Sequence, residues 1–134
     1  MKKIEWNDKY SVGVMEIDDQ HKTLIVTINK LLEDQKDEYN ATKFKTVLSS
    51  LIHYAYTHFA TEEQYMLKVK FPEMDQHVME HVEFIMKTLD LALKVENGKG
   101  ESIKELLYYL EKWFSSHVLG TDRLYIPYIT KNLK

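Results

Sequence analysis

The chain has 134 residues, 44% of them hydrophobic, with only four glycines and two prolines, which suits one helical domain over residues 1–134. The net charge is −3 with both signs mixed, so we expect no nucleic-acid partner, and the lack of cysteine excludes disulfides and thiolate metal sites. No stretch approaches the roughly 20 apolar residues of a membrane span, and the N-terminus lacks a signal-peptide run, so we expect a cytoplasmic protein with no membrane partner.

The first part of the chain is predicted to be an irregular arm over residues 1–17, broken at Gly13. Its apolar anchors are Trp6, Val12, Val14 and Ile17. A first helix follows, with Asp18 or Asp19 as its N-cap, and runs to about Asp37. The apolar stripe of this helix is Leu24, Ile25, Ile28, Leu31 and Leu32.

After a turn at residues 38–40, a second helix is predicted from about Ala41 to about Val69. Its inner face is Phe44, Leu48, Leu51, Ala55, His58, Glu62 and Met66. A third helix opens at Pro72, because the first helical turn tolerates proline, and ends at about Glu96 before Asn97-Gly98. The residues expected to be buried on this helix are Val78, Phe84, Ile85, Leu89 and Ala92.

A fourth helix begins near Glu101 or Ser102 and is interrupted at Gly120. Its apolar residues are Ile103, Leu106, Leu107, Leu110, Trp113 and Phe114. A short final helical segment runs from Thr121 to about Asn132, with Leu124, Ile126 and Ile129 as anchors. Because short connections make neighbouring helices antiparallel, we predict an all-α, up-down-up-down four-helix bundle with an irregular N-terminal arm and a short C-terminal helical segment.

Histidines and one carboxylate recur on the inner faces of these helices. A residue four positions along a helix is rotated by about 40°, so His58 and Glu62 share a face, as do His77 and His81. The remaining inward positions are His21, in phase with the first stripe, and His117, in phase with the fourth. Each of the four helices therefore directs at least one histidine toward the bundle axis.

These inward groups favour a metal site. Burying Glu62 without a partner would cost several kcal/mol, and a metal would also explain the histidines. Imidazole and carboxylate ligands suit iron, manganese or zinc. One histidine on an apolar face is usually an ordinary core residue, but two i,i+4 pairs and further histidines on both other helices argue against that interpretation. His53 lies about 140° from His58 on the second helix, so we predict that it is not a ligand.

Several segments agree in residue type, order and spacing with one known family. They are Trp6 and Val12-Gly13, Ile17-Asp18-Asp19-Gln20-His21, His58-Phe59-Ala60-Thr61-Glu62-Glu63, Pro72, His77-Val78-Met79-Glu80-His81, and Trp113-Phe114-Ser115-Ser116-His117-Val118-Leu119-Gly120-Thr121-Asp122. In these segments the chain resembles hemerythrins, in particular single-domain bacterial hemerythrins. The resemblance covers nearly the whole chain.

The resemblance implies two iron ions (Fe2+/Fe3+) joined by an oxo or hydroxo bridge. The ligands it implies are His77, His81 and His117 on one iron, His21 and His58 on the other, and Glu62 and Asp122 bridging both. Helical phase alone does not identify Asp122. It comes five positions after His117, and in a regular helix two such residues lie on different faces. The resemblance therefore predicts a π-bulge or a local break near Gly120.

This ligand set leaves one iron a ligand short. The resemblance accordingly implies reversible binding of dioxygen, end-on as a hydroperoxide at the five-coordinate iron, by a carrier or storage protein that is not an enzyme. The apolar pocket around it would comprise Leu24, Phe59, Trp113 and Leu119. The alternatives are an oxygen or redox sensor and a di-iron oxidase, peroxidase or nitric-oxide-processing enzyme. The Glu-x-x-His motif of carboxylate-rich di-iron enzymes does not occur in the sequence.

Overall fold

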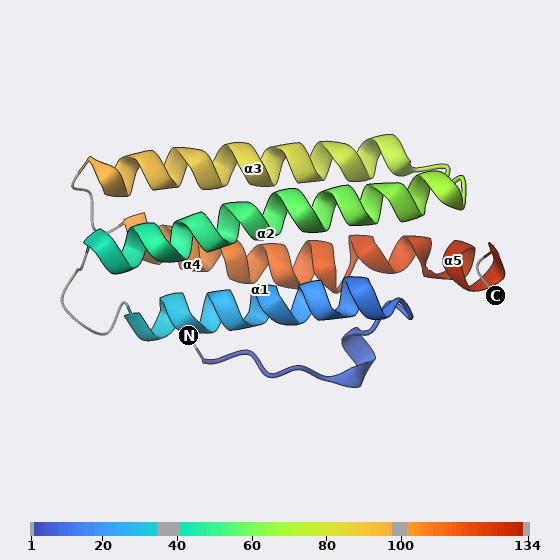
Figure 1. The fold of residues 1–134 in the computed structure, drawn as a ribbon, viewed down its shortest axis with the longest axis horizontal. Coiled ribbons are helices and arrows are strands. Elements are labelled where there is room, and N and C mark those ends of the chain that lie inside the picture. The colour runs from blue at the N-terminus through green and yellow to red at the C-terminus, as the bar shows by residue number, and fades with distance from the viewer. Residues whose placement is uncertain (1, 35–40, 98–101, 133–134) are drawn as a thin grey trace.

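Four long helices lie side by side in the computed structural model, which describes residues 2–34, 41–97 and 102–132 (Figure 1). They are α1 (Met15–Asp34), α2 (Ala41–Lys68), α3 (Met74–Glu96) and α4 (Ser102–Trp113). Each packs against the next, and α4 also contacts α1, which closes the bundle. After α4 the chain continues as a π-helical turn (Phe114–Val118), a 3-10 turn (Thr121–Tyr125) and α5 (Ile126–Asn132). The predicted four-helix bundle is confirmed.

The N-terminal arm differs from the prediction in where α1 begins. α1 starts at Met15, so Asp18 lies within its first turn and is not its N-cap. The carboxylate of Asp18 instead accepts hydrogen bonds from the Val12 amide at 2.9 Å and from the Ser11 hydroxyl. Asp18 therefore ties the arm to α1. The predicted end of this helix at Asp37 and the turn at residues 38–40 lie outside the described residues.

The rest of the arm runs back along α1 (Figure 1). The side-chain amide of Asn29 on α1 makes two hydrogen bonds with the backbone of Ile4. Its oxygen accepts from the Ile4 amide at 2.9 Å, and its NH2 group donates to the Ile4 carbonyl at 2.8 Å. Tyr10 closes a short 3-10 turn (Asp8–Tyr10) and sets its ring edge-on to Phe114, 5.6 Å away between centroids. These contacts hold the arm against both α1 and the π-helical turn.

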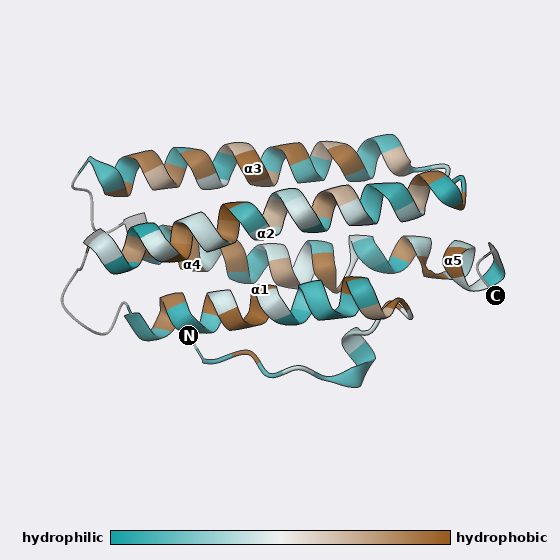
Figure 2. Cartoon of the chain, viewed as in Figure 1, coloured by the Kyte–Doolittle hydropathy of each residue, from teal (hydrophilic) through white to brown (hydrophobic). Residues whose placement is uncertain are grey.

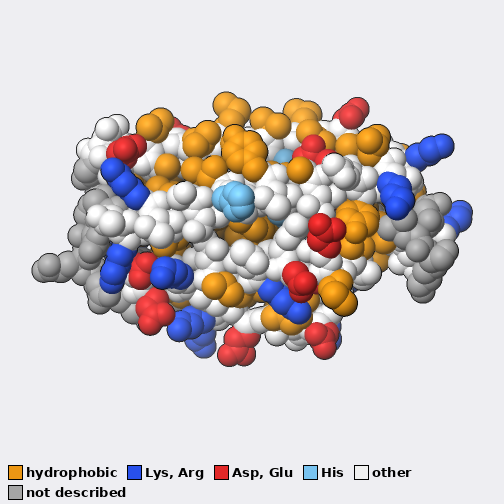
Figure 3. Space-filling model, in the orientation of Figure 1, with side chains coloured by type: hydrophobic (Ala, Val, Ile, Leu, Met, Phe, Trp, Pro, Cys, Tyr) orange, Lys and Arg blue, Asp and Glu red, His pale blue; other side chains and the backbone are white. Residues whose placement is uncertain are grey.

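The start and inner face of α3 also differ from the prediction. Pro72 lies in the turn before α3, which begins two residues later at Met74. Leu89 is 42% exposed, and the residues that α3 buries are His77, His81, Phe84, Thr88, Leu91 and Val95. Of the other predicted core positions, Val78, Ile85 and Ala92 are only half-buried. Hydrophobic residues recur along α3 (Figure 2), and hydrophobic side chains gather on the surface above it (Figure 3). This helix therefore carries apolar residues on two faces, only one of which is inside.

Two apolar clusters make up the core. The larger lies among α1, α2, α3 and α4, and the smaller consists of Val12, Ile17, Met66, Val69, Phe71, Tyr125 and Ile129. In the C-terminal segment, Ile129 is buried as predicted, Ile126 is half-buried, and Leu124 is exposed because Tyr125 takes the inward position. Within the described ranges, no helix has the length and apolarity needed to cross a membrane.

Along both α1 and α2, polar residues separate the two clusters. On α1, Ile17 belongs to the smaller cluster and Leu24 to the larger, with His21 between them. On α2, Glu62 likewise lies between Phe59 and Met66. The candidate site therefore occupies a buried polar layer between two apolar ones.

Candidate metal centre

Seven ionisable side chains converge in this buried layer, and each is at most 2% exposed. They are His21 of α1, His58 and Glu62 of α2, His77 and His81 of α3, His117 of the π-helical turn and Asp122 of the 3-10 turn. All seven positions singled out in the sequence are thus brought together. His53 is exposed, as its helical phase predicts.

The donor atoms fall into two overlapping groups, within each of which all ligand atoms lie within 4.8 Å of one another. One group is Glu62, His77, His81 and His117, and the other is His21, His58, Glu62 and Asp122. Three histidines therefore belong to one group and two to the other. This donor set, with only nitrogen and oxygen atoms, fits two adjacent metal ions such as iron, manganese or zinc.

The carboxylate of Glu62 lies between the two groups. Its Oε1 is 2.6 Å from His77 Nε2 and 2.9 Å from His81 Nε2. Its Oε2 faces the other group, 3.4 Å from His58 Nε2 and 3.9 Å from His21 Nε2. Each group of histidines therefore receives one oxygen of Glu62.

Asp122 divides its oxygens in the same way. Its Oδ1 is 3.0 Å from His77 Nε2 and 2.9 Å from His117 Nε2, while its Oδ2 is 3.1 Å from His21 Nε2. Two carboxylates thus span both groups, an arrangement that suits bridging between two metal ions.

An irregular backbone brings Asp122 to this position. The Leu119 amide bonds to the Phe114 carbonyl at 3.0 Å, an i to i+5 bond, and the 3-10 turn follows Gly120 directly. A side chain at Gly120 would place its Cβ 2.4 Å from the Ser116 carbonyl oxygen, so glycine allows the two turns to approach closely. The local break predicted near Gly120 is confirmed.

Aromatic rings pack flat against three of the histidines. Phe59 stacks on His81 at 3.9 Å with 5° between the planes, and Trp113 stacks on His117 at 3.9 Å with 11°. Tyr54 stacks on His58 at 5.2 Å. Of the other predicted pocket residues, Leu24 is fully buried in the larger cluster, and Leu119 is half-buried against it.

Tyr125 is a buried residue of the site that sequence reasoning did not identify. Its hydroxyl donates to Glu62 Oε2 at 2.9 Å, and the side chain is fully buried. Burial and the negative charge of Glu62 raise the pKa of Tyr125 well above its usual value, so the phenol keeps its proton and remains a donor. A 3-10 turn repeats every three residues, which is why Tyr125 shares a face with Asp122.

Charge is balanced within the protein itself. Burial alone would raise the pKa of Glu62 and Asp122, but the surrounding histidines hold both well below their usual values. Burial would lower the pKa of His77 and His117, but hydrogen bonds and attraction to the same carboxylates raise them to about 9 and about 10. The two buried carboxylates therefore need cationic partners, either imidazolium groups or metal ions.

Comparison with known proteins agrees with this geometry. The model of the hemerythrin HHE cation binding domain matches residues 12–129. The bacteriohemerythrin of Clostridium acetobutylicum is 30% identical over 90% of this chain and 97% of its own, and the myohemerythrin of Riftia pachyptila is 26% identical over 90% and 88%. A wild-type hemerythrin crystal structure superposes with a TM-score of 0.81 at 27% identity, covering 94% of this chain and 97% of its own. The chain therefore belongs to the hemerythrin family.

Proposed function

We propose that this protein binds dioxygen reversibly, as a carrier or store, at a di-iron centre in the buried polar layer. The proposed ligands are His77, His81 and His117 for one iron, His21 and His58 for the other, and Glu62 and Asp122 as bridges. The single observation that supports this most directly is the unequal division of the histidines, together with the oxygens that each carboxylate offers to both groups.

The inequality matters because it would leave one iron with a coordination position open. His77, His81 and His117 with one oxygen from each carboxylate would supply five protein ligands, whereas His21 and His58 with the other oxygen of each carboxylate would supply four. A pair of ferrous ions held by these residues would supply the two electrons that reversible binding of dioxygen requires.

The protein's own contribution is to keep this layer dry. The stacked rings of Phe59 and Trp113 cover His81 and His117, and Leu24 lies one helical turn beyond His21. Water and mobile proton donors promote irreversible oxidation, so an apolar wall favours release of unchanged dioxygen. Tyr125 directs its proton at Glu62 Oε2, and its raised pKa keeps that proton in place.

Anaerobic loading with ferrous iron, followed by exposure to air and visible spectroscopy, tests the proposal. We expect two irons per chain and an absorption band that appears in air and disappears under argon over repeated cycles. Rapid decay of the band with release of an oxidised product would instead indicate an enzyme. A chain that binds two irons but gives no oxygen-dependent band would contradict oxygen binding.

Two single variants provide a matched pair for this experiment. His58→Ala removes a proposed ligand, so we expect the iron content and the band to fall. His53→Ala changes a histidine on the same helix that is exposed and outside the site, so both readings should match the unmodified protein.

A further inference from the structure

The five histidines of the site all direct Nε2 toward the carboxylates, which leaves Nδ1 of each ring facing outward. Three of these outward nitrogens have a partner. His81 Nδ1 lies 2.9 Å from Glu63 Oε2, His117 Nδ1 lies 3.1 Å from Glu80 Oε1, and His58 Nδ1 lies 2.7 Å from Gln20 Oε1. In the described part of the chain, the buried Nδ1 atoms of His21 and His77 have no hydrogen-bond partner.

These outer partners differ in charge between the two donor groups, which we call the three-histidine half (His77, His81 and His117) and the two-histidine half (His21 and His58). The three-histidine half receives two carboxylates, from Glu63 and Glu80, whereas the two-histidine half receives one neutral amide, from Gln20. A carboxylate that accepts the Nδ1 proton makes the ring a stronger donor to a metal, and an amide oxygen does so less because it carries no net charge. The half with fewer histidines therefore also has the weaker donors.

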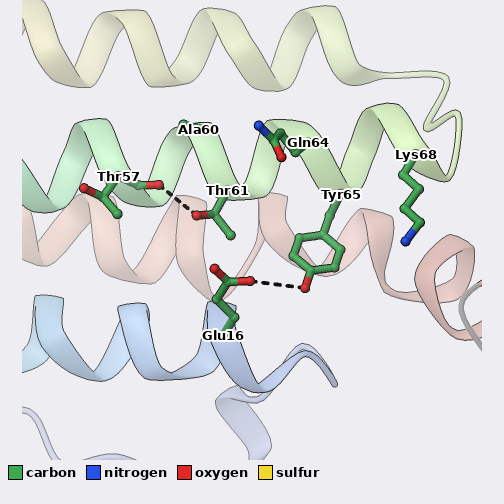
Figure 4. A pocket seen from close by; sticks show the side chains of 7 residues that line it. All are labelled: Glu16, Thr57, Ala60, Thr61, Gln64, Tyr65 and Lys68. Carbon is green, nitrogen blue, oxygen red and sulfur yellow. Dashed lines mark hydrogen bonds between the residues drawn. The ribbon is translucent and has the colours of Figure 1, made fainter.

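The orientation of the Gln20 amide is set by Thr61. Gln20 Nε2 donates to Thr61 Oγ1 at 3.0 Å. Thr61 in turn donates its own proton to the Thr57 carbonyl at 2.9 Å (Figure 4). With that proton engaged, the Thr61 oxygen can only accept, so the amide group of Gln20 must point its NH2 at Thr61 and its oxygen at His58.

This orientation decides which ring nitrogen of His58 carries the proton. An amide oxygen only accepts hydrogen bonds, so Nδ1 of His58 must be the protonated nitrogen. The lone pair of Nε2 is then directed toward Glu62 and the proposed metal position. Free imidazole has no such constraint, so the pair Gln20–Thr61 prepares His58 as a ligand before metal binds.

Thr61 also connects this hydrogen-bond chain to the surface. It is half-buried and lines a depression of about 500 Å³ between α1 and α2, together with Glu16, Thr57 and Tyr65 (Figure 4). Thr61 belongs to neither apolar cluster and is partly exposed, so a substitution there should not disturb the packing of the core.

We propose that Gln20, oriented by Thr61, is a positioning residue for the two-histidine half of the centre. It holds the Nε2 lone pair of His58 toward the metal and, being neutral, adds no negative charge at the outer nitrogen of that ring. The inference rests on the di-iron centre proposed above. Because the half with the open position then has the weaker donors, its ferrous state is harder to oxidise, and loss of oxygen-binding protein by autoxidation is slow.

Gln20→Glu tests the charge, since it changes one atom of the side chain and little of its size. In the iron-loaded protein we expect autoxidation to become several-fold faster, because a carboxylate at Nδ1 makes His58 a stronger donor and so favours the ferric state. Glu63→Gln is the matched control because it makes the reverse exchange at His81, and it should not speed autoxidation.

Thr61→Val tests the orientation while keeping the side-chain volume. In the metal-free chain, where no metal fixes the ring, 15N NMR should show a protonated Nδ1 and an unprotonated Nε2 on His58 in the unmodified protein. In Thr61→Val this signal should weaken or exchange with solvent, while the melting temperature shows that the chain remains folded.

The proposal is overturned if Gln20→Glu leaves the autoxidation rate unchanged, or if Thr61→Val leaves the His58 signal as it was. The two readouts also separate this inference from the proposed function. If the iron-loaded protein does not bind dioxygen reversibly, oxygen binding fails as a function, but the NMR signal of His58 still decides the role of Gln20 and Thr61.

Discussion

Asp122 lies five residues after His117 in the chain, yet its Oδ1 atom is 2.9 Å from His117 Nε2. In a regular α-helix, residues five apart point about 140° away from one another. The π-helical turn and the 3-10 turn that follows Gly120 remove this divergence. The position of Asp122 between the two histidine groups therefore depends on a backbone distortion of a few residues.

Gly120→Ala should disturb this distortion directly. The added Cβ would lie 2.4 Å from the Ser116 carbonyl oxygen, which is backbone and cannot move without rearranging the π-helical turn. We expect Asp122 to shift, iron content after loading to fall from two toward one per chain, and the melting temperature to drop. Metal analysis and thermal unfolding measure both effects.

Gly13→Ala is the control for a general glycine effect. Gly13 has a φ of +83°, a conformation that costs any other residue about 1 kcal/mol or more. Apart from its two chain neighbours, however, no described atom lies within 4 Å of the added Cβ. This variant should lose stability and keep its iron. Full iron content in Gly120→Ala would show that the close approach at Gly120 does not position Asp122.

Two buried tyrosines near Glu62 should respond differently to loss of their hydroxyls. Tyr125 donates to Glu62 Oε2, so Tyr125→Phe leaves a buried carboxylate oxygen short of a donor, at a cost of about 1–3 kcal/mol. The hydroxyl of Tyr54 is buried with no hydrogen-bond partner in the described residues, so Tyr54→Phe should be neutral or slightly stabilising. Urea unfolding of the metal-free proteins measures the difference.

Iron affinity provides a second measurement on which Tyr125→Phe and Tyr54→Phe should differ. Tyr125→Phe frees Glu62 to rotate, so iron should bind more weakly, whereas Tyr54→Phe keeps the ring that stacks on His58 and should bind iron as before. Equal losses in the two variants would mean that the hydroxyl of Tyr125 does not orient Glu62.

Helical periodicity identified most of the site because most of it lies on regular helices. The inner face of α2, including His58 and Glu62, is buried as predicted, and so are His21, His77 and His81. Asp122 was predicted only from the resemblance to hemerythrins, since it follows the break in the helix. Tyr125 was missed for the same reason: in the 3-10 turn the repeat changes from 3.6 to 3.0 residues, so a helical phase counted from α4 no longer applies.

The wrong assignment of Leu89 has a different cause. α3 carries a second apolar stripe, Met79, Val82, Met86, Leu89 and Leu93, which is exposed. Periodicity finds both stripes but does not say which one faces the core. Following the phase of His77 and His81 would have selected Phe84, Leu91 and Val95 and excluded Leu89.

The stability of the metal-free protein should fall as the pH rises above neutral. Burial lowers the pKa of His77 and His117, but the contacts with Asp122 and Glu62 outweigh it and raise these pKa values to about 9 and about 10. A raised pKa means that the folded state binds the proton more tightly than the unfolded state, whose histidines have a pKa of about 6.5. This contribution is complete below about pH 6.5 and is lost as the pH passes 9 to 10.

Thermal unfolding between pH 6 and pH 10 measures the effect. The chelator-treated protein should melt at progressively lower temperature over this range. The iron-loaded protein should not lose stability in this way, because metal replaces the protons on these nitrogens. A melting temperature of the metal-free protein that is constant or rises over this range would contradict the assignment of His77 and His117 as imidazolium partners of the carboxylates.

Leu119 is predicted to limit entry of water to the centre. It lies between His117 and Asp122 in the chain, is half-buried and packs against the larger apolar cluster. Leu119→Ala should admit water beside the centre and speed autoxidation of the oxygenated protein several-fold. The cost in stability should be about 2 kcal/mol or less, because Leu119 is only half-buried.

Leu124→Ala controls for a general loss of leucine volume near Asp122. Leu124 lies two residues after Asp122 but is 54% exposed, so its truncation opens no path to the buried layer. Stopped-flow oxygenation followed by the decay of the visible band compares the two variants at equal iron content. Since both remove the same three carbon atoms, faster decay in Leu119→Ala alone would assign the effect to water entry, and equal rates would refute it.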